Sequence, residues 1–187
     1  SDSEDARKVA SKLDIPYYVL DYTESFSKNV VDNFTQMYAQ GLTPNPCVEC
    51  NRSVKFDHFI TQAKKLNCDK VATGHYAKII KKNNEFELHK ADYLDKDQSY
   101  VLHMLKSSDL ENISFPLGEI SKPEVRQIAA RIGLKTAFKK DSQDICFVGK
   151  KDYRSFVEKR IDLTSPGEIF DIEGNKVGDH NGIHEFT

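Results

Sequence analysis

Helical segments and short apolar runs alternate along the first 76 residues, and this order constrains the fold more than any other feature. Residues 3–14 carry apolar side chains at helical spacing, and residues 17–20 form an apolar run typical of a buried strand. Two further helices are predicted over residues 25–40 and 51–66, and a second strand over residues 70–72. The order helix–strand–helix–helix–strand predicts an α/β domain with a mostly parallel sheet.

The pattern changes in the middle of the chain. Residues 78–90 predict a hairpin with its turn at residues 82–85, and residues 97–105 predict a helix. Ser121 has the chemistry of an N-cap for a helix over residues 123–132. These elements extend the α/β domain.

The last part of the chain is predicted to be β-rich. We expect a strand over residues 145–148, a helix over 152–159, and short β segments over 168–171 and 176–178. We therefore predict one α/β domain over residues 1–150 and the beginning of a small, truncated central domain over residues 151–187.

Composition limits the classes of protein that fit. Hydrophobic residues make up 39% and charged residues 30% of the chain, as in soluble globular proteins, and no apolar run approaches the length of a membrane span. The formal net charge of -2 lacks the basic excess typical of nucleic-acid binders. The four cysteines are too sparse for a secreted disulfide framework, so we predict a reducing, cytoplasmic location.

Three of the four cysteines lie in segments rich in polar residues. Cys47 and Cys50 form a CxxC motif between a proline-rich loop and a predicted helix. This spacing suits a metal ion, an iron–sulfur cluster or a dithiol couple, with Cys146 as a third ligand and His75 as a fourth. The alternative is a pair of half-buried cysteines without chemistry. Cys68 lies in a segment that indicates no chemistry.

Two other motifs are weak signals when taken alone. Gly74 and His75 follow a predicted strand, where ligands gather in parallel sheets and where glycine permits close backbone approach; a tight turn with a surface histidine would look the same. Lys96, Asp97 and Gln98 read as the capped start of a helix, with Asp97 as the N-cap.

Taken together, the motifs resemble the family of tRNA-specific 2-thiouridylases. The matching segments are Thr43-Pro44-Asn45-Pro46 with Cys50-Asn51, Val54-Lys55-Phe56, Ala72-Thr73-Gly74-His75-Tyr76, Lys96-Asp97-Gln98-Ser99-Tyr100, Phe115-Pro116-Leu117-Gly118, Lys122-Pro123-Glu124-Val125-Arg126, and Lys140-Asp141-Ser142 with Ile145-Cys146-Phe147. They occur in the family's order and cover nearly the whole chain.

The resemblance implies a Rossmann-like domain of the adenine nucleotide alpha hydrolase (PP-loop) type and an ATP- and Mg²⁺-dependent sulfur transfer to position 2 of the wobble uridine of tRNA. It implies that Cys146 carries a persulfide and that Cys50 is the nucleophile that assists sulfur release, through a disulfide between the two. It also implies an ATP contact at Gly74. The implied tRNA contacts are Asn45, Pro46, Cys47, His75, Lys96, Asp97 and Gln98.

The chain departs from the family pattern in two respects. The family's Ser-Gly-Gly-x-Asp-Ser loop and its closing β-barrel are absent, so we expect an internal fragment that is inactive alone. Cys47 stands where many members carry aspartate, which creates a possible iron–sulfur ligand set of Cys47, Cys50 and Cys146.

Three functions therefore stay open at the level of the sequence. The first is thiouridine synthesis by a monomer that receives sulfur from a donor protein. The second is a non-catalytic metal- or cluster-binding module associated with RNA. The third is another PP-loop ligase that uses ATP and in which the cysteines are incidental. No membrane partner is predicted.

Overall fold

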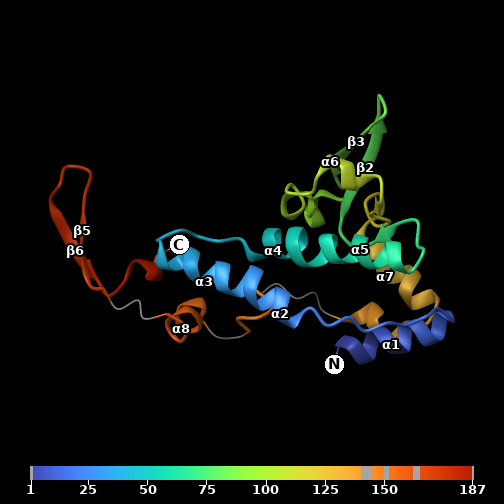
Figure 1. Cartoon of the computed structure of the whole chain (residues 1–187), viewed down its shortest axis with the longest axis horizontal. Helices are drawn as coiled ribbons and strands as arrows, with labels where there is room; N and C mark the ends of the chain where they lie inside the picture. Colours follow the sequence, from blue (N-terminus) through green and yellow to red (C-terminus); the bar gives the residue numbers. More distant parts are fainter. Residues whose placement is uncertain (1, 140–144, 150–151, 162–164, 187) are drawn as a thin grey trace. The chain divides into compact units, whose positions relative to one another are not determined.

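The computed structural model describes residues 2–139, 145–149, 152–161 and 165–186. The chain divides into two compact units, which are described separately. The first comprises Ser1–Thr23 and Asn51–Asp141, and the second comprises Glu24–Cys50 and Ser142–Thr187 (Figure 1). The predicted domain boundary at residue 150 stays a prediction.

The first unit contains short helices around a small amount of sheet. Its elements are α1 (Asp2–Leu13), the π-helical turns η2 (Cys50–Phe56), α5 (Asp57–Lys65), β1 (Val71–Ala72), β2 (Ala77–Lys82), β3 (Glu85–Lys90), the 3₁₀ turns η3 (Leu94–Lys96) and η4 (Ser99–Val101), α6 (Ser107–Leu110), β4 (Ile113–Ser114), α7 (Lys122–Arg131) and η5 (Lys135–Phe138). Large side chains of its buried core include Phe56, Leu102 and Ile113.

Strands β1 and β4 form a parallel pair, in which β1 is the strand predicted over residues 70–72 and β4 is a strand that the sequence did not predict. Val71 is in register with Ile113 and Ala72 with Ser114. The Thr73 amide extends the ladder by donating to the Ser114 carbonyl at 3.2 Å. The α/β class is therefore confirmed, and the carboxyl ends of both strands point to one edge, where ligands bind in such sheets.

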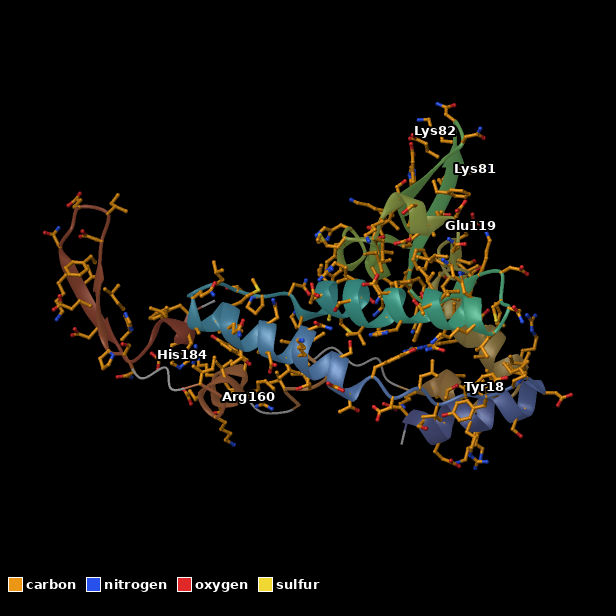
Figure 2. The ribbon with its side chains drawn as sticks, in the orientation of Figure 1. Tyr18, Lys81, Lys82, Glu119, Arg160 and His184 are labelled. Carbon is orange, nitrogen blue, oxygen red and sulfur yellow. The ribbon has the colours of Figure 1, made fainter. Side chains whose placement is uncertain are left out.

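Strands β2 and β3 form the predicted hairpin, which is antiparallel (Figure 1). Its turn is made by Asn83 and Asn84, which have φ angles of 49° and 64°. Asparagine tolerates this left-handed backbone better than most residues, and two such residues suit a two-residue hairpin turn. Lys81 and Lys82 lie beside this turn (Figure 2).

Gly118 lies against the first residue of the hairpin. A Cβ atom at Gly118 would be 2.1 Å from the Ala77 carbonyl oxygen, which no side chain can accept. The Gly118 carbonyl also accepts a hydrogen bond from the Asp92 amide, just after β3, at 2.9 Å. The loop after β4 thus lies against both strands at the open end of the hairpin.

The second unit is a helical core with a small β-hairpin. Its elements are α2 (Thr23–Phe26), the π-helical turn η1 (Ser27–Val31), α3 (Asp32–Ala39), α4 (Pro46–Glu49), α8 (Tyr153–Glu158), β5 (Gly167–Phe170), β6 (Lys176–His180) and η6 (Ile183–Glu185). Phe34, Tyr38 and Val157 form its buried core. Strands β5 and β6 pair in antiparallel fashion, as expected for a β-rich segment.

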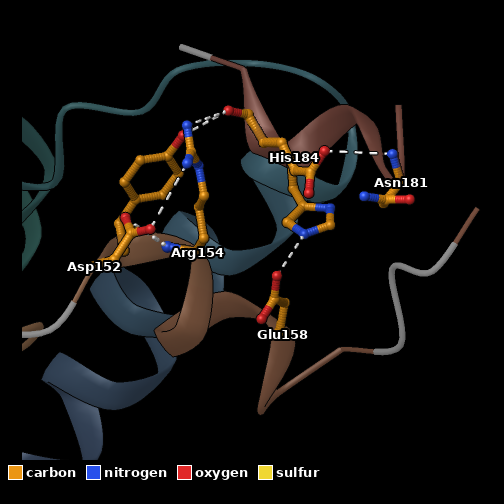
Figure 3. A network of polar contacts seen from close by, with 7 residues as sticks. Asp152, Arg154, Glu158, Asn181 and His184 are labelled. Carbon is orange, nitrogen blue, oxygen red and sulfur yellow. Dashed lines mark hydrogen bonds and ion pairs between the residues drawn. The ribbon is translucent and has the colours of Figure 1, made fainter. Parts of the chain in front are cut away.

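A polar network connects η6 to α8 (Figure 3). The His184 ring is buried, and its Nε2 atom lies 3.2 Å from Oε1 of the Glu158 carboxylate. The Tyr153 hydroxyl and the Arg154 guanidinium both donate to the Glu185 carbonyl, at 3.2 and 2.9 Å. The segment that follows β6 is therefore held on the helical core.

Three predicted elements are wrong. Residues 17–20 form no strand: Tyr18 is 62% and Val19 72% exposed, and no described strand pairs with them. Residues 97–105 contain only the 3₁₀ turn η4, and residues 145–148 form a turn. Apolar residues are present in each case, but none of the described strands pairs with residues 17–20 or 145–148, and the apolar residues Val101 and Leu102 are buried from a 3₁₀ turn and the residue after it.

The long predicted helices are confirmed, although π-helical turns interrupt two of them. Most boundaries shift by one or two residues, but the helix predicted over residues 51–66 already begins at Pro46, with α4, so the CxxC motif lies inside it. Ser121 caps α7 as predicted: its hydroxyl accepts from the Glu124 amide, and the Glu124 carboxylate accepts from the Ser121 amide. Among the described residues, no helix is long and apolar enough to span a bilayer.

Candidate functional site

The residues after β1 lie where the sequence placed them, at the carboxyl end of a parallel strand. Gly74 is exposed, and a Cβ atom there would meet only Leu117, at an ordinary 3.7 Å. The Thr73 hydroxyl lies 2.8 Å from His75 Nδ1. No packing within the described chain requires glycine at position 74, so its bare backbone is open to a ligand.

His75 is half-buried between two aromatic rings. The rings of Phe56 and Phe115 lie with their centroids 6.0 Å from the imidazole. Burial, and then the nearby charge of Lys55, lower the pKa of His75 from 6.5 to about 4. The imidazole is therefore neutral near pH 7, and it can exchange hydrogen bonds with a ligand without carrying a charge.

The segment Lys96–Gln98 is held against this turn. The Tyr76 amide donates to Gln98 Oε1 at 3.1 Å, and the Gln98 amide donates to the Tyr76 carbonyl at 2.8 Å. The turn that contains His75 and the segment Lys96–Gln98 thus lie together in the first unit, although Tyr76 and Gln98 are 22 residues apart in sequence. The resemblance assigns both segments to ligand contact.

Asp97 does not cap the predicted helix. Its carboxylate accepts hydrogen bonds from the Ala91 amide at 2.8 Å and from the Ser99 hydroxyl at 2.7 Å. Asp97 therefore stabilises an irregular loop between β3 and η4. An acidic residue before an apolar run can cap a helix or stabilise a loop, and the bond to the Ala91 amide, six residues earlier, shows that Asp97 does the second.

Asn51 also belongs to this region. In the sequence it is only part of a matching segment, and no role is predicted for it. Its side chain is only 3% exposed, and its Nδ2 donates to the Val101 carbonyl at 3.3 Å. Its Oδ1 atom is buried without a partner among the described residues. A polar residue in the apolar register of a helix was the available signal.

The proline-rich loop of the second unit delivers the CxxC motif to a helix start. The Asn45 side chain accepts a hydrogen bond from the Cys47 amide at 3.2 Å and so caps α4, and Pro46 occupies the first turn. Cys47 is exposed and Cys50 is half-buried. The predicted position of the motif at the beginning of a helix is confirmed.

Cys146 lies on an exposed turn anchored by its neighbours. Ile145, Phe147 and Val148 pack against the core of the second unit, and the Val148 amide closes the turn by donating to the Ile145 carbonyl at 3.1 Å. Cys146 itself is exposed. The polar residues that precede this turn, Lys140, Asp141, Ser142 and Asp144, lie outside the described residues.

Cys50 and Cys146 are attached to the same helical segment. Helix α4, which ends beside Cys50, packs against η1. Phe147 packs edge-on against Phe26 at 5.6 Å and Phe34 at 5.2 Å, between ring centroids, just before and after η1. Neither cysteine is buried in the apolar core, so both are accessible to reagents.

The four cysteines, all within the described part of the chain, form no disulfide. Among the residues that the structure describes, no three histidine, cysteine or carboxylate side chains gather as ligands of a metal ion. Cys47, Cys50 and Cys146 are thus not assembled as an iron–sulfur ligand set, and no metal site for Mg²⁺ is built from described side chains.

A family model and individual relatives both match this chain. The family model described as the tRNA methyl transferase HUP domain matches residues 1–150. The chain is 47% identical over 187 residues to the tRNA-specific 2-thiouridylase MnmA of Rickettsia peacockii (strain Rustic), a match that covers 100% of the chain and 51% of that protein.

Two further relatives give the same result. The chain is 46% identical over 184 residues to the tRNA-specific 2-thiouridylase MnmA of Chloroflexus aurantiacus (strain ATCC 29366 / DSM 635 / J-10-fl), covering 97% of the chain and 51% of that relative. The corresponding protein of Rickettsia prowazekii (strain Madrid E) is 48% identical over 187 residues, 100% of the chain and 52% of the relative. The chain spans about half the length of these curated relatives.

Proposed function

Because the chain belongs to the tRNA methyl transferase HUP domain family, we propose that it forms the catalytic part of a tRNA-uridine 2-sulfurtransferase. The observation that carries the proposal is the attachment of two accessible cysteines, Cys50 and Cys146, to the same helical segment of the second unit. The names of the relatives point to the same substrate, since each is a tRNA-specific 2-thiouridylase.

The proposed reaction starts with ATP. The O2 atom of the wobble uridine takes up AMP with release of pyrophosphate, because a carbonyl oxygen is a poor leaving group and AMP is a good one. The exposed backbone at Gly74, at the carboxyl end of β1, is the place where this chain would approach the nucleotide. Mg²⁺ would enter with the phosphates of ATP.

Sulfur transfer then uses both cysteines. The terminal sulfur of a persulfide on Cys146 attacks C2 of the uridine, and AMP leaves. The Cys50 thiolate attacks the Cys146 sulfur of the resulting nucleotide–cysteine disulfide; the old sulfur–sulfur bond breaks, its outer sulfur stays on the nucleotide, and a Cys50–Cys146 disulfide forms. The balance requires two thiols that can meet and a donor protein that reloads Cys146.

The remaining site residues are proposed to position the tRNA. Asn45, Pro46 and Cys47 would face the target base. The neutral His75 and the segment Lys96–Gln98 would contact the rest of the tRNA. The two hydrogen bonds between Gln98 and Tyr76, the residue after His75, support a common surface in the first unit. Since the formal net charge is -2, we expect most of the affinity for tRNA to come from elements beyond this chain.

The iron–sulfur alternative is less favoured, because the described side chains do not gather as a ligand set. A third possibility is another PP-loop ligase in which the cysteines are incidental. A cytoplasmic location, a monomeric state and a sulfur-donor partner stay predictions.

The test is a chimera in which this chain replaces the 187 matching residues of the Rickettsia peacockii relative. The chimera should convert uridine to 2-thiouridine in tRNA with ATP and a persulfide donor, as measured by mass spectrometry of nucleosides. Cys50→Ser and Cys146→Ser should each abolish the product, and Cys68→Ser should not. Thiolation that survives both of the first two changes would refute the proposal and favour the third possibility.

A further inference from the structure

Cys47 and Cys50 are joined by a local backbone contact. The Cys50 amide donates to the Cys47 carbonyl as well as to the Pro46 carbonyl. A bond between residues i and i+3 tightens the turn toward 3₁₀ geometry, in which side chains at these two positions lie one above the other on the same side of the helix. The two thiol-bearing side chains therefore leave the helix on a common face.

This spacing is compatible with a disulfide. Residues i and i+3 on a helix have Cβ atoms about 5–6 Å apart. Disulfide-bonded cysteines have Cβ atoms about 3.5–4.5 Å apart, so the bond closes when the backbone of this first turn tightens by about 1–2 Å. The exposure of Cys47 gives an external reductant access to the pair.

We propose that Cys47 is the resolving cysteine of this protein: it releases Cys146 from the Cys50–Cys146 disulfide, and it does so as one half of a Cys47–Cys50 redox pair. The proposal rests on the proposed function, because that reaction generates the disulfide that must be resolved. It adds a role for the residue that the resemblance places only at the target base.

The step balances without a further oxidant. The Cys47 thiolate attacks the Cys50 sulfur, the Cys50–Cys146 bond breaks, and Cys146 leaves as a thiolate that is ready to be loaded again. The product is a Cys47–Cys50 disulfide, and no net oxidation occurs. An external dithiol then reduces this disulfide with two electrons and two protons, forming its own disulfide. Attack within one helical turn is favoured over attack by a thiol from solution, because the reacting groups are already held together.

Cys68 has no cysteine within its own helical turn, in contrast to Cys47. It lies after α5 in the first unit, and its thiol donates to the carbonyl of its own segment, at Leu66, with a distance of 3.8 Å. Its nearest cysteine in the sequence is 18 residues away, so no local turn presents it to another thiol. Cys68 therefore serves as the matched control.

The experiment maps disulfides in the 187-residue chain itself after titration with diamide. Trypsin leaves Cys47 and Cys50 together in peptide 29–52 and Cys146 in peptide 141–150. A Cys47–Cys50 disulfide therefore appears as the loss of two hydrogens within one peptide, whereas a Cys50–Cys146 disulfide links two peptides. We expect the oxidised wild-type chain to contain the first species with Cys146 still open to iodoacetamide.

Cys47→Ser should shift the oxidised chain to the linked species, and Cys68→Ser should leave the wild-type pattern. Linked peptides that persist as the final product in the wild-type chain would overturn the proposal, as would a wild-type chain in which no Cys47–Cys50 disulfide forms. In the chimera, Cys47→Ser should yield one product per enzyme and then stop at low dithiol concentration. Continued turnover of that variant would refute the role of Cys47, while absence of any product from the unsubstituted chimera would refute the proposed function instead.

Discussion

Tyr76 and Gln98 hold each other through two hydrogen bonds, one from the Tyr76 amide to the Gln98 side chain and one from the Gln98 amide to the Tyr76 carbonyl, at 3.1 and 2.8 Å. The pair joins the turn after β1 to the loop before η4. Because one bond uses a side chain and the other only the backbone, substitution can remove the first without removing the second.

Gln98→Ala should lower the free energy of unfolding of the chain by about 1–2 kcal/mol, because the partly buried Tyr76 amide loses its acceptor. Urea denaturation measures this. Gln98→Glu keeps an acceptor at the same position and should recover most of the loss. Gln127→Ala, on the exposed face of α7, should change little. An equal effect of Gln98→Ala and Gln127→Ala would contradict the assigned bond.

The stability of the chain should rise with pH between about 4 and 6.5 because of His75. Its pKa is about 4 in the folded chain and 6.5 as the ordinary value, so in this window the unfolded chain binds a proton that the folded chain does not. Protonation should therefore cost on the order of 3 kcal/mol over the window. Thermal unfolding of wild type and His75→Asn across this range measures the difference.

Removal of the positive charge at Lys55 separates the two causes of this shift. Lys55→Met should raise the pKa of His75 only part of the way toward 6.5, because burial is the larger cause. NMR titration of the imidazole measures the pKa directly. A pKa near 6.5 in the wild-type chain would show that the ring is not held as described.

Substitution by alanine should change the stability of the chain at one glycine of the first unit and leave it nearly unchanged at another. Gly74→Ala should leave the free energy of unfolding within about 0.5 kcal/mol of wild type, since a Cβ atom there makes an ordinary contact. Gly118→Ala should destabilise the chain by about 1–3 kcal/mol or more, because its Cβ atom would overlap the Ala77 carbonyl. Denaturant unfolding of both variants measures the contrast.

The substitution at Gly74 also tests the proposed nucleotide contact. Gly74→Ala in the chimera should weaken ATP binding, measured by calorimetry, although it leaves the fold stable. Unchanged ATP affinity would indicate that the backbone at Gly74 does not approach the nucleotide.

Phe147→Ala should loosen the turn that carries Cys146. The ring packs against Phe26, Phe34 and Phe156, with centroids 5.2 to 5.6 Å away. Loss of this half-buried ring should cost about 2 kcal/mol of stability. It should also slow formation of the Cys50–Cys146 disulfide in a Cys47→Ser background.

Phe147→Leu restores apolar volume and should recover most of the disulfide formation rate. Mass spectrometry of the linked peptides follows the rate. If the Cys47→Ser chain with Phe147→Ala forms the Cys50–Cys146 disulfide as fast as the Cys47→Ser chain alone, the turn does not position Cys146.

The sequence predicted the elements whose signals are local. Ser121 and Glu124 form their capping box within one helical turn, and Asn83 and Asn84 form a hairpin turn that depends only on their own backbone preferences. The long helices were also predictable, because their apolar spacing extends over several turns. All of these signals can be read in a window of a few residues.

The remaining elements depend on contacts between distant residues. Asp97 would have capped a helix on local grounds, but its carboxylate accepts from the Ala91 amide, and the adjacent Gln98 is bonded to Tyr76, 22 residues earlier, so this segment forms a loop. Tyr18 and Val19 are residue types that are common in β-strands. A strand also requires a neighbouring strand to pair with, and none of the described strands pairs with them. The lowered pKa of His75 could not be predicted either, because it depends on burial and on Lys55, 20 residues earlier.

The two asparagines at the tip of the β2–β3 hairpin offer a practical handle. They lie in a turn whose strands are paired from Ala77 with Lys90 to Lys82 with Glu85, and both are exposed. An engineered cysteine at the exposed Glu85, beside these two left-handed positions and not in one of them, would carry a fluorophore far along the ladder from Gly118 in a chain whose own cysteines have been replaced. Such a dye would report RNA encounters by its brightness while leaving the fold beneath it undisturbed.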